Sequence, residues 1–255
     1  MNENREITGV VLAAGQSTRM SAAGIKQSKL ALELAGKPVI KYVTDTLIKS
    51  GIKRNIIIVG YQADEIKQVL GNGFEFVLQK ERLGTGHALM QVRDHLKNYT
   101  GDLFVVVGDS PFLTTEVINT LVNKHRLSGA AATILTACYD KPPDYGRIIR
   151  DKKGKLLKVV EVKDANKDEL AIKEVHTSHY CFRAEVVLPL LSEIKNNNAK
   201  KEYYLTDIIE MLLKHNNLVE TVQAEDPVVG MAINTMEDFV QAEKTMKGVI
   251  KKNGN

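Results

Sequence analysis

Residues 9–29 read GVVLAAGQSTRMSAAGIKQSK, an apolar segment that runs into a loop of small and polar residues. The run 10–12 is typical of a strand buried in a parallel sheet. Residues 13–15 then turn the chain with almost no side-chain bulk, so a ligand can lie against the backbone. The stretch therefore predicts an α/β fold with a ligand site at the end of its first strand.

The loop after this strand collects groups that bind anions. Residues 16–18 offer N–H and hydroxyl groups, and Arg19, Lys26 and Lys29 add cations. Together they favour a polyphosphate ligand. Glycine, serine and threonine are also ordinary turn residues, so the loop alone leaves phosphate binding open. It matches neither the GxxxxGK[ST] loop nor the GxGxxG fingerprint.

Strands and helices alternate along the next hundred residues. Hydrophobic periodicity predicts helices over 39–48, 63–70, 83–96 and 115–127, and strands over 56–59, 74–78, 103–107 and 130–137. This alternation predicts a doubly wound, mostly parallel, Rossmann-like sheet with helices on both faces. Such sheets bind ligands at the carboxyl ends of their strands, where we expect Gly15, Gln79 and Asp109.

The pattern changes after residue 137. We expect a hairpin turn at 151–154 and strands over 156–162 and 174–182, which predicts a β-rich substrate lobe inserted into the main sheet. Helical patterns return at 186–194 and 207–213, and Thr235 has the capping-box spacing that begins a final helix to about residue 250. We therefore expect one domain over 1–255, with a nucleotide-binding half (1–137), a half facing the second substrate (138–235), and a C-terminal helix and tail (236–255).

The composition argues against several classes of function. The 35 basic and 31 acidic residues give a net charge of +4, too small and too dispersed to indicate nucleic-acid binding. No apolar run approaches about 18 residues, so we expect no membrane span. Cys138 and Cys181 lie in apolar surroundings and are expected to be reduced core residues of a cytoplasmic protein. The oligomeric state stays open.

Asp109 follows the apolar strand 103–107 and precedes Ser110-Pro111. A carboxylate at the ligand edge of the sheet suits Mg²⁺, which prefers hard oxygen ligands. The same aspartate could simply begin the turn before the next helix. His87 is expected inside a helix and is interpreted as a packing residue.

Two stretches carry a family resemblance. The first loop resembles the Leu-Ala-Ala-Gly-x-x-Thr-Arg-Met signature of sugar-phosphate nucleotidyltransferases. Residues 79–88, QKERLGTGHA, closely resemble the N-terminal uridylyltransferase (pyrophosphorylase) domain of the bifunctional enzymes that form UDP-N-acetylglucosamine. Residues 145–148, 160–165 and 197–207 match the same family in order and spacing, so the resemblance covers roughly residues 7–239.

The resemblance implies a Mg²⁺-dependent enzyme that joins a nucleoside triphosphate, UTP in this family, to a sugar 1-phosphate such as N-acetylglucosamine 1-phosphate and releases pyrophosphate. Carried over residue by residue, it implies catalytic Arg19 and Lys29 and the metal ligands Asp109 and Asn234. It implies nucleotide binding by Leu12, Ala13, Ala14, Gly15, Gln79, Gly84 and Thr85, and sugar-phosphate binding by Gly146, Glu161, His176, Tyr204 and Thr206. Lys26 is the alternative to Lys29, because the stretch after Arg19 is longer than in the family.

The sequence departs from the family mainly where the sugar is expected. Residues 174–178 read EVHTS in place of Glu-x-Asn-Thr-Gly, so His176 replaces an asparagine and Ser178 a glycine. Val107 stands where a tyrosine is common, and Ala232 replaces a glycine before Asn234. An exchanged hydrogen-bonding group can alter substrate choice strongly, so the acceptor stays open. The alternatives are a cytidylyl- or other nucleotidyltransferase with a different phosphorylated acceptor, and a catalytically idle nucleotide-sugar sensor.

Overall fold

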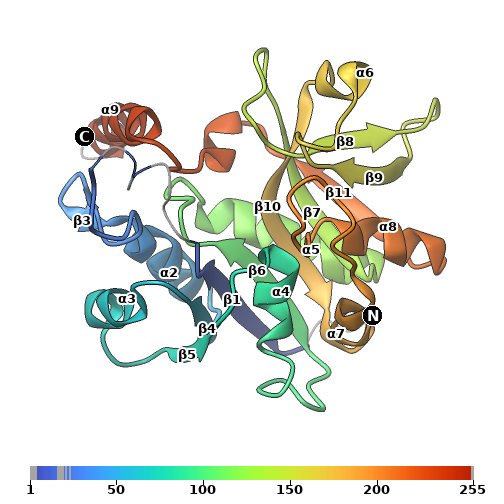
Figure 1. Ribbon diagram of the computed structural model, residues 1–255, viewed down its shortest axis with the longest axis horizontal. Helices are drawn as coiled ribbons and strands as arrows, with labels where there is room; N and C mark the ends of the chain where they lie inside the picture. The colour runs from blue at the N-terminus through green and yellow to red at the C-terminus, as the bar shows by residue number, and fades with distance from the viewer. Residues whose placement is uncertain (1–4, 16–19, 21, 23, 254–255) are drawn as a thin grey trace.

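The structure is a computed structural model, and it describes residues 5–15, 20, 22 and 24–253 (Figure 1). The strands are β1 Ile7–Ala13, β2 Glu33–Leu34, β3 Lys37–Pro38, β4 Arg54–Val59, β5 Glu75–Leu78, β6 Asp102–Val107, β7 Ala132–Cys138, β8 Arg147–Arg150, β9 Leu156–Val160, β10 Glu174–Arg183 and β11 Val219–Gln223. The helices are α2 Val39–Lys49, α3 Ala63–Leu70, α4 Thr85–Met90, α5 Thr115–Ser128, α6 Lys167–Leu170, α7 Ala184–Leu190, α8 Asp207–Lys214 and α9 Met236–Asn253, with 3₁₀ turns at Leu191–Glu193 and Pro227–Gly230.

Within these residues one nine-stranded sheet runs through the molecule. Its order is β11-β7-β10-β6-β1-β4-β5, and β8 and β9 extend it beside β10. The strands β6, β1, β4 and β5 are parallel, as the alternating pattern predicts. Figure 1 shows β8, β9 and α6 together at the upper right. These elements belong to the segment after residue 137 in which the sequence predicts a β-rich lobe. The mixed, mostly parallel α/β fold is therefore confirmed.

Alternating side chains along the central strands fill two cores, one on each face of the sheet. Val11 and Phe104 pack in the core that includes residues of α2, α3, α5 and α9. Their neighbours Val10 and Val105 pack in the core that includes residues of α4, α7 and α8. A parallel strand covered on both faces needs apolar residues at every position, which explains the uninterrupted runs in the sequence.

Phe104→Ala is expected to lower the free energy of unfolding by about 3–5 kcal/mol, because the removed ring leaves a cavity in a fully buried core. Urea denaturation followed by circular dichroism measures the change. The control is Leu127→Ala, whose side chain is 69% exposed on α5 and which should stay within about 0.5 kcal/mol of the wild type. Equal effects of the two substitutions would contradict this description of the core.

Three expectations from the sequence need correction. The strand over 174–182 exists, but it lies in the main sheet, antiparallel between β6 and β7. The helix over 83–96 is shorter: α4 ends at Met90, and the next turns use i→i+3 bonds such as Val92 N–H to the Leu89 carbonyl at 3.2 Å. Cys181 is buried but Cys138 is exposed at the end of β7, so only one cysteine is a core residue.

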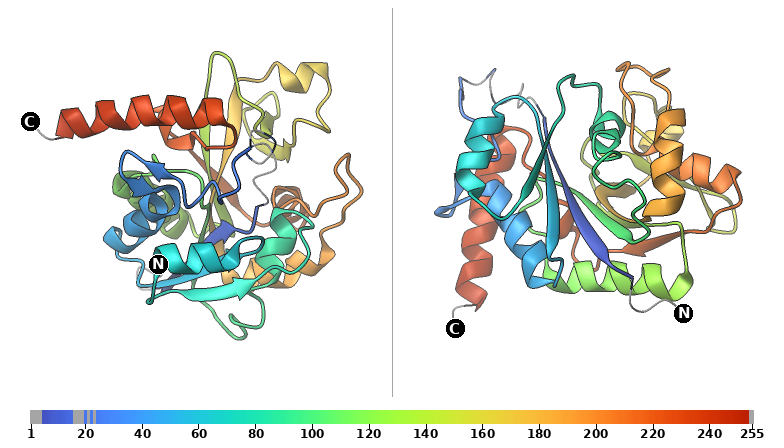
Figure 2. Two further views of the ribbon diagram at one scale, coloured as in Figure 1. Left: turned by 60° about the vertical axis from the view of Figure 1, so that its left-hand side comes forward. Right: turned by 90° about the horizontal axis from the view of Figure 1, so that it is seen from below.

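The capping box at Thr235 is present. The Asp238 N–H donates to the Thr235 hydroxyl at 3.1 Å, and the Thr235 N–H donates to the Asp238 carboxylate at 2.8 Å. Helix α9 packs through Ala242 and Met246, and its C-terminal part extends beyond the body of the molecule (Figure 2). Among the described helices, none is both long and apolar enough to cross a membrane.

Candidate active site

The carboxyl ends of β1, β5 and β6 bring Gly15, Gln79 and Asp109 to one edge of the sheet, as predicted. The Gly108 N–H donates to the Leu12 carbonyl at 3.0 Å and ties the loop after β6 to the end of β1. Gly60, after β4, lies so close that an added Cβ would sit 2.8 Å from the Ala14 carbonyl oxygen. The turn of small residues is therefore held between its two neighbouring strands.

A cavity of about 390 Å³, here called the nucleotide cavity, lies at this edge. It is lined by all seven residues predicted to bind nucleotide together with two other predicted site residues: Leu12, Ala13, Ala14, Gly15, Gln79, Gly84 and Thr85, with Lys29 and Asp109. Arg82 and Glu202 add one charge of each sign to its lining. Arg19, the other predicted catalytic residue, lies outside the described residues.

A second cavity of about 480 Å³, here called the acceptor cavity, adjoins the first. Its lining includes Gly146, Glu161, His176 and Asn234, and it shares Thr85, Val107 and Asp109 with the nucleotide cavity. Tyr204 and Thr206 are buried and do not line it. The Thr206 hydroxyl instead donates to the Glu161 carboxylate at 3.0 Å, so it can orient this carboxylate from behind.

Lys29, Asp109 and Asn234 meet where the two cavities join. The Lys29 ammonium donates to Asp109 Oδ2 and, at 2.9 Å, to Asn234 Oδ1. The Ile233 N–H bonds the Asp109 carbonyl at 3.0 Å, which holds the late segment against the loop after β6. The alternative lysine, Lys26, is exposed and lines neither cavity. The geometry thus supports Lys29 over Lys26.

The two oxygens that converge on this ammonium also form a small donor set for a divalent cation. In the part of the chain that the structure describes, no cluster of three or more His, Cys, Asp or Glu side chains could hold a metal ion. Asp109 and Asn234 supply one carboxylate and one amide oxygen. This set fits Mg²⁺, which usually binds one or two carboxylates and takes its other ligands from phosphates and water.

The far end of the nucleotide cavity is built from two distant segments. Gly84 has φ +105°, and a Cβ there would lie 2.7 Å from the Tyr203 carbonyl oxygen, so only glycine fits. The Gly86 N–H donates to the Tyr203 carbonyl at 2.8 Å, and the Tyr203 N–H donates to the Leu83 carbonyl at 2.7 Å. The motif around residue 84 and the motif around residue 204 therefore form one wall.

Sequence reasoning missed the role of one residue in this wall. His87 was expected to pack inside a helix, but its Nδ1 lies 3.0 Å from Nε2 of Gln79 and its Nε2 lies 3.2 Å from Nε2 of Gln91. Gln79 also donates to the Gly84 carbonyl at 3.1 Å. The sequence held one signal for this role, a histidine in the first turn of a helix that follows Gln79, which was predicted to bind nucleotide.

The acceptor cavity contains polar groups with altered titration. Burial raises the pKa of Glu161, against the opposing effect of the Thr206 hydroxyl. Burial lowers the pKa of His176, in the cavity lining, to about 3, and that of His179, which is fully buried and does not line the cavity, to about 4, so both imidazoles are neutral at pH 7. The His176 Nδ1 accepts from the Ser178 N–H at 3.3 Å. Ser178 has φ +61° in an irregular part of β10, a backbone conformation that favours the glycine of the family pattern Glu-x-Asn-Thr-Gly.

His179→Asn is expected to make stability less sensitive to acid. The folded protein holds the pKa of His179 at about 4, whereas unfolding restores the ordinary value of 6.5. As the pH falls below 6.5 the unfolded state binds the proton first, so the wild type loses stability between about pH 6.5 and pH 4. Urea unfolding at steps from pH 7 to pH 4 should show a smaller loss in the variant. An equal loss of unfolding free energy in both proteins between pH 7 and pH 4 would contradict the lowered pKa of His179.

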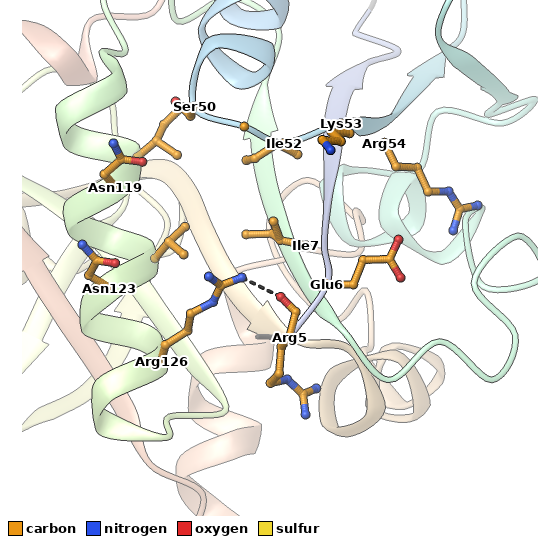
Figure 3. A pocket seen from close by; sticks show the side chains of 13 residues that line it. Arg5, Glu6, Ile7, Ser50, Ile52, Lys53, Arg54, Asn119, Asn123 and Arg126 are labelled. Atoms are coloured by element: carbon orange, nitrogen blue, oxygen red, sulfur yellow. Dashed lines mark hydrogen bonds between the residues drawn. The ribbon is translucent and has the colours of Figure 1, made fainter. Parts of the chain in front are cut away.

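A further cavity, of about 410 Å³, lies at the opposite end of the sheet (Figure 3). It is lined by the start of β1, the loop between α2 and β4, and α5. Arg126 donates to the Arg5 backbone carbonyl at 2.7 Å, and Arg5 donates to the Asp102 carboxylate at 2.9 Å. Arg54, the third arginine of its lining, donates to the Glu75 carboxylate at 2.8 Å, so these arginines hold the fold. None of the predicted site residues that the structure describes lines this cavity.

Comparison with known proteins agrees with the geometry. The family model described as Nucleotidyl transferase matches residues 8–245. The chain is 41% identical over 238 residues to the bifunctional protein GlmU of Geobacillus thermodenitrificans, covering 93% of this chain and 51% of that protein. It is 40% identical over 241 residues to bifunctional GlmU of Bacillus cereus, covering 94% and 52%. The chain thus spans about half the length of these curated relatives.

A solved structure shows the same fold. A chain from Bacillus anthracis, assigned as a glucose-1-phosphate thymidylyltransferase and solved in complex with a sucrose, superposes with a TM-score of 0.78. The two chains share 19% sequence identity, and the superposition covers 94% of each. At that identity the likeness concerns the fold alone. Because the family model matches residues 8–245, nearly the whole chain, the chain belongs to the nucleotidyl transferase family.

Proposed function

We propose that this chain is a sugar-1-phosphate nucleotidyltransferase that joins UTP to a sugar 1-phosphate and releases pyrophosphate. The observation that carries the proposal is the pair of adjoining cavities that share Asp109, with Lys29 and Asn234 at their junction. An enzyme that joins two phosphorylated substrates needs two such sites meeting at one cationic point. The resemblance of residues 79–88 to the uridylyltransferase domain of enzymes that form UDP-N-acetylglucosamine supports N-acetylglucosamine 1-phosphate as the acceptor.

The chemistry needs no protein nucleophile. An oxygen of the sugar 1-phosphate attacks the α-phosphorus of UTP, the bond to the β-phosphate oxygen breaks, and pyrophosphate leaves. The acceptor phosphate is already anionic at neutral pH, so the protein has to align two polyanions and offset their repulsion. Lys29 and Arg19 would spread the charge that grows on the α-phosphate and the leaving group. The backbone of residues 13–15 would hold the nucleotide against the sheet edge.

Asp109 and Asn234 would hold Mg²⁺. When bound there, the ion would neutralise phosphate charge at the junction of the cavities and lower the barrier to attack. Asp109 contributes the negative charge of this pair, and the bond from the Ile233 N–H keeps Asn234 beside it. The side chains are thus oriented before substrates arrive.

The acceptor cavity would bind the sugar through Glu161 and His176, with Tyr204 and Thr206 behind them and the Gly146 backbone at its side. His176 is neutral and buried, so it offers hydrogen bonds but no charge. We also propose a cytoplasmic location, which fits the free cysteines Cys138 and Cys181. The division into nucleotide half, acceptor half and C-terminal helix is proposed with the boundaries expected from the sequence.

Glu161→Ala is expected to raise KM for the sugar 1-phosphate about tenfold to a hundredfold, because a half-buried carboxylate in the lining of the acceptor cavity is an acceptor for sugar hydroxyl groups. The KM for UTP should change less than about twofold and serves as the internal control. Steady-state kinetics with each substrate varied in turn measures both values. A rise in the KM for UTP alone would show that Glu161 has been assigned to the wrong substrate.

The proposal is tested by pyrophosphate release with UTP, CTP, GTP and dTTP, each against a panel of sugar 1-phosphates that includes N-acetylglucosamine and glucose. Turnover with UTP and one sugar supports the proposal and identifies the acceptor. Turnover with CTP instead of UTP favours the cytidylyltransferase alternative. Measurable UTP binding without turnover on any sugar 1-phosphate favours a nucleotide-sugar sensor and overturns the proposal.

A further inference from the structure

The amide of Gln79 is held in one orientation. The side chain is 4% exposed and lines the nucleotide cavity. Its Nε2 donates one hydrogen to the Gly84 carbonyl at 3.1 Å and lies 3.0 Å from Nδ1 of His87. An amide nitrogen carries two hydrogens, so both are engaged. What Gln79 can offer a ligand is the carbonyl oxygen Oε1, to which no residue in the described part of the chain donates.

The contact with Gln79 indicates which ring nitrogen of His87 carries the proton. A neutral imidazole accepts at one nitrogen and donates at the other. The shorter contact, from Gln79, makes Nδ1 the acceptor and leaves the proton on Nε2. Because a neutral ring accepts at only one nitrogen, the 3.2 Å approach of Gln91 to that Nε2 is then a packing contact, and the Gln91 amide donates to the His87 backbone carbonyl at 2.9 Å. Together with the Gly84 carbonyl, His87 therefore keeps Gln79 from presenting its NH₂ group to the cavity.

We propose that His87 is a positioning residue for base selection. It fixes Gln79 so that Oε1 faces the base, and a base bound there must present a ring N–H. Uracil has this donor at N3, whereas N3 of cytosine is an acceptor and would face the Gln79 oxygen without a hydrogen bond. The proposal rests on the proposed function, since it requires the nucleotide cavity to bind a pyrimidine nucleotide. It deepens that function by assigning the choice of UTP over CTP to a residue behind the site.

The test compares two substitutions of His87, one that removes the hydrogen-bond acceptor at the position of Nδ1 and one that keeps an acceptor there. His87→Leu removes one of the two acceptors of the Gln79 NH₂ group, so that the Gly84 carbonyl alone opposes a turn of this group toward the base. His87→Asn keeps an acceptor oxygen near the position of Nδ1. Gln91→Leu is the matched control, because it removes the other neighbour of the ring. Thermal melting checks that all three variants are folded.

The readout is the ratio of kcat/KM for UTP to kcat/KM for CTP, measured by pyrophosphate release. We expect His87→Leu to lower this ratio about tenfold or more, because a hydrogen-bonded partner for uracil is lost while one for cytosine is gained. His87→Asn and Gln91→Leu should keep the ratio within about threefold of the wild type. An unchanged ratio in His87→Leu would overturn the proposal. An equal fall in His87→Leu and His87→Asn would also overturn it, because that result indicates packing alone.

The same variants are titrated with UTP and CTP by calorimetry, which separates this inference from the proposed function. If the wild type binds UTP but turns over no acceptor, the proposed function fails while the ratio of the two dissociation constants still tests His87. A preference for UTP that His87→Leu lowers and His87→Asn keeps supports the inference. Equal affinity of the wild type for UTP and CTP overturns it.

Discussion

Asp109→Ala is expected to lower kcat/KM by about a thousandfold or more. The substitution removes the carboxylate shared by both cavities and bonded to Lys29. Several kcal/mol of charge stabilisation depend on a metal ion at such a point, and about 4 kcal/mol corresponds to a thousandfold change in rate. Steady-state pyrophosphate release measures the loss, and Asp109→Asn, which keeps the shape but not the charge, should show a similar one.

The matched control is Asp144→Ala, which removes another carboxylate from the lining of the acceptor cavity but not from its junction with the nucleotide cavity. Its kcat/KM should stay within about tenfold of the wild type. Mn²⁺ binding, followed by electron paramagnetic resonance, should weaken in Asp109→Ala and not in the control. Full Mg²⁺-dependent activity of Asp109→Ala would show that the metal ligands have been assigned wrongly.

Lys29→Met is expected to lower kcat by about a hundredfold or more. Its ammonium lies at the junction of the cavities, and removing a preorganised donor from a developing charge costs about two to three orders of magnitude in rate. If the amine acts in the transition state, kcat and kcat/KM should fall by the same factor. Single-turnover kinetics with saturating UTP measures the chemical step directly.

Lys26→Met is the control for this experiment, because Lys26 lies three residues away, is exposed and lines neither cavity. It should change kcat by less than about threefold. A thermal melt is needed for Lys29→Met, since its bonds to Asp109 and Asn234 also join two distant segments. A large loss from Lys26→Met with none from Lys29→Met would reverse the assignment of the two lysines.

Much of the fold could be predicted from local patterns. Helix α3 has the predicted bounds, because its apolar positions have helical spacing and Gly71, with φ +68°, ends it. The final helix begins after Thr235 because its capping box is local chemistry. The placement of β10 within the main sheet could not be predicted, since strand partners far apart in the sequence leave no local signal. Strand β11 was missed because its half-exposed side chains do not form an apolar run.

The site could be predicted in outline from family resemblance and not from local patterns. Lys29, Asp109 and Asn234 are far apart in the sequence, and family resemblance together with the rule of strand ends brought them into one site. Tyr204 and Thr206 were expected to surround the sugar phosphate but lie behind the lining of the acceptor cavity. Such positions depend on side-chain direction, which a motif does not specify. The orientation of Gln79 by His87 could not be predicted from the sequence for the same reason.

The most direct measurement follows the α-phosphate. The protein is incubated with Mg²⁺, UTP labelled at the α-phosphate and N-acetylglucosamine 1-phosphate, and both products are quantified over time. We expect the label to enter UDP-N-acetylglucosamine and one pyrophosphate to appear for each nucleotide sugar formed. Label recovered as UMP would show attack by water, and label remaining in UTP with every sugar 1-phosphate tested would contradict the proposed transfer.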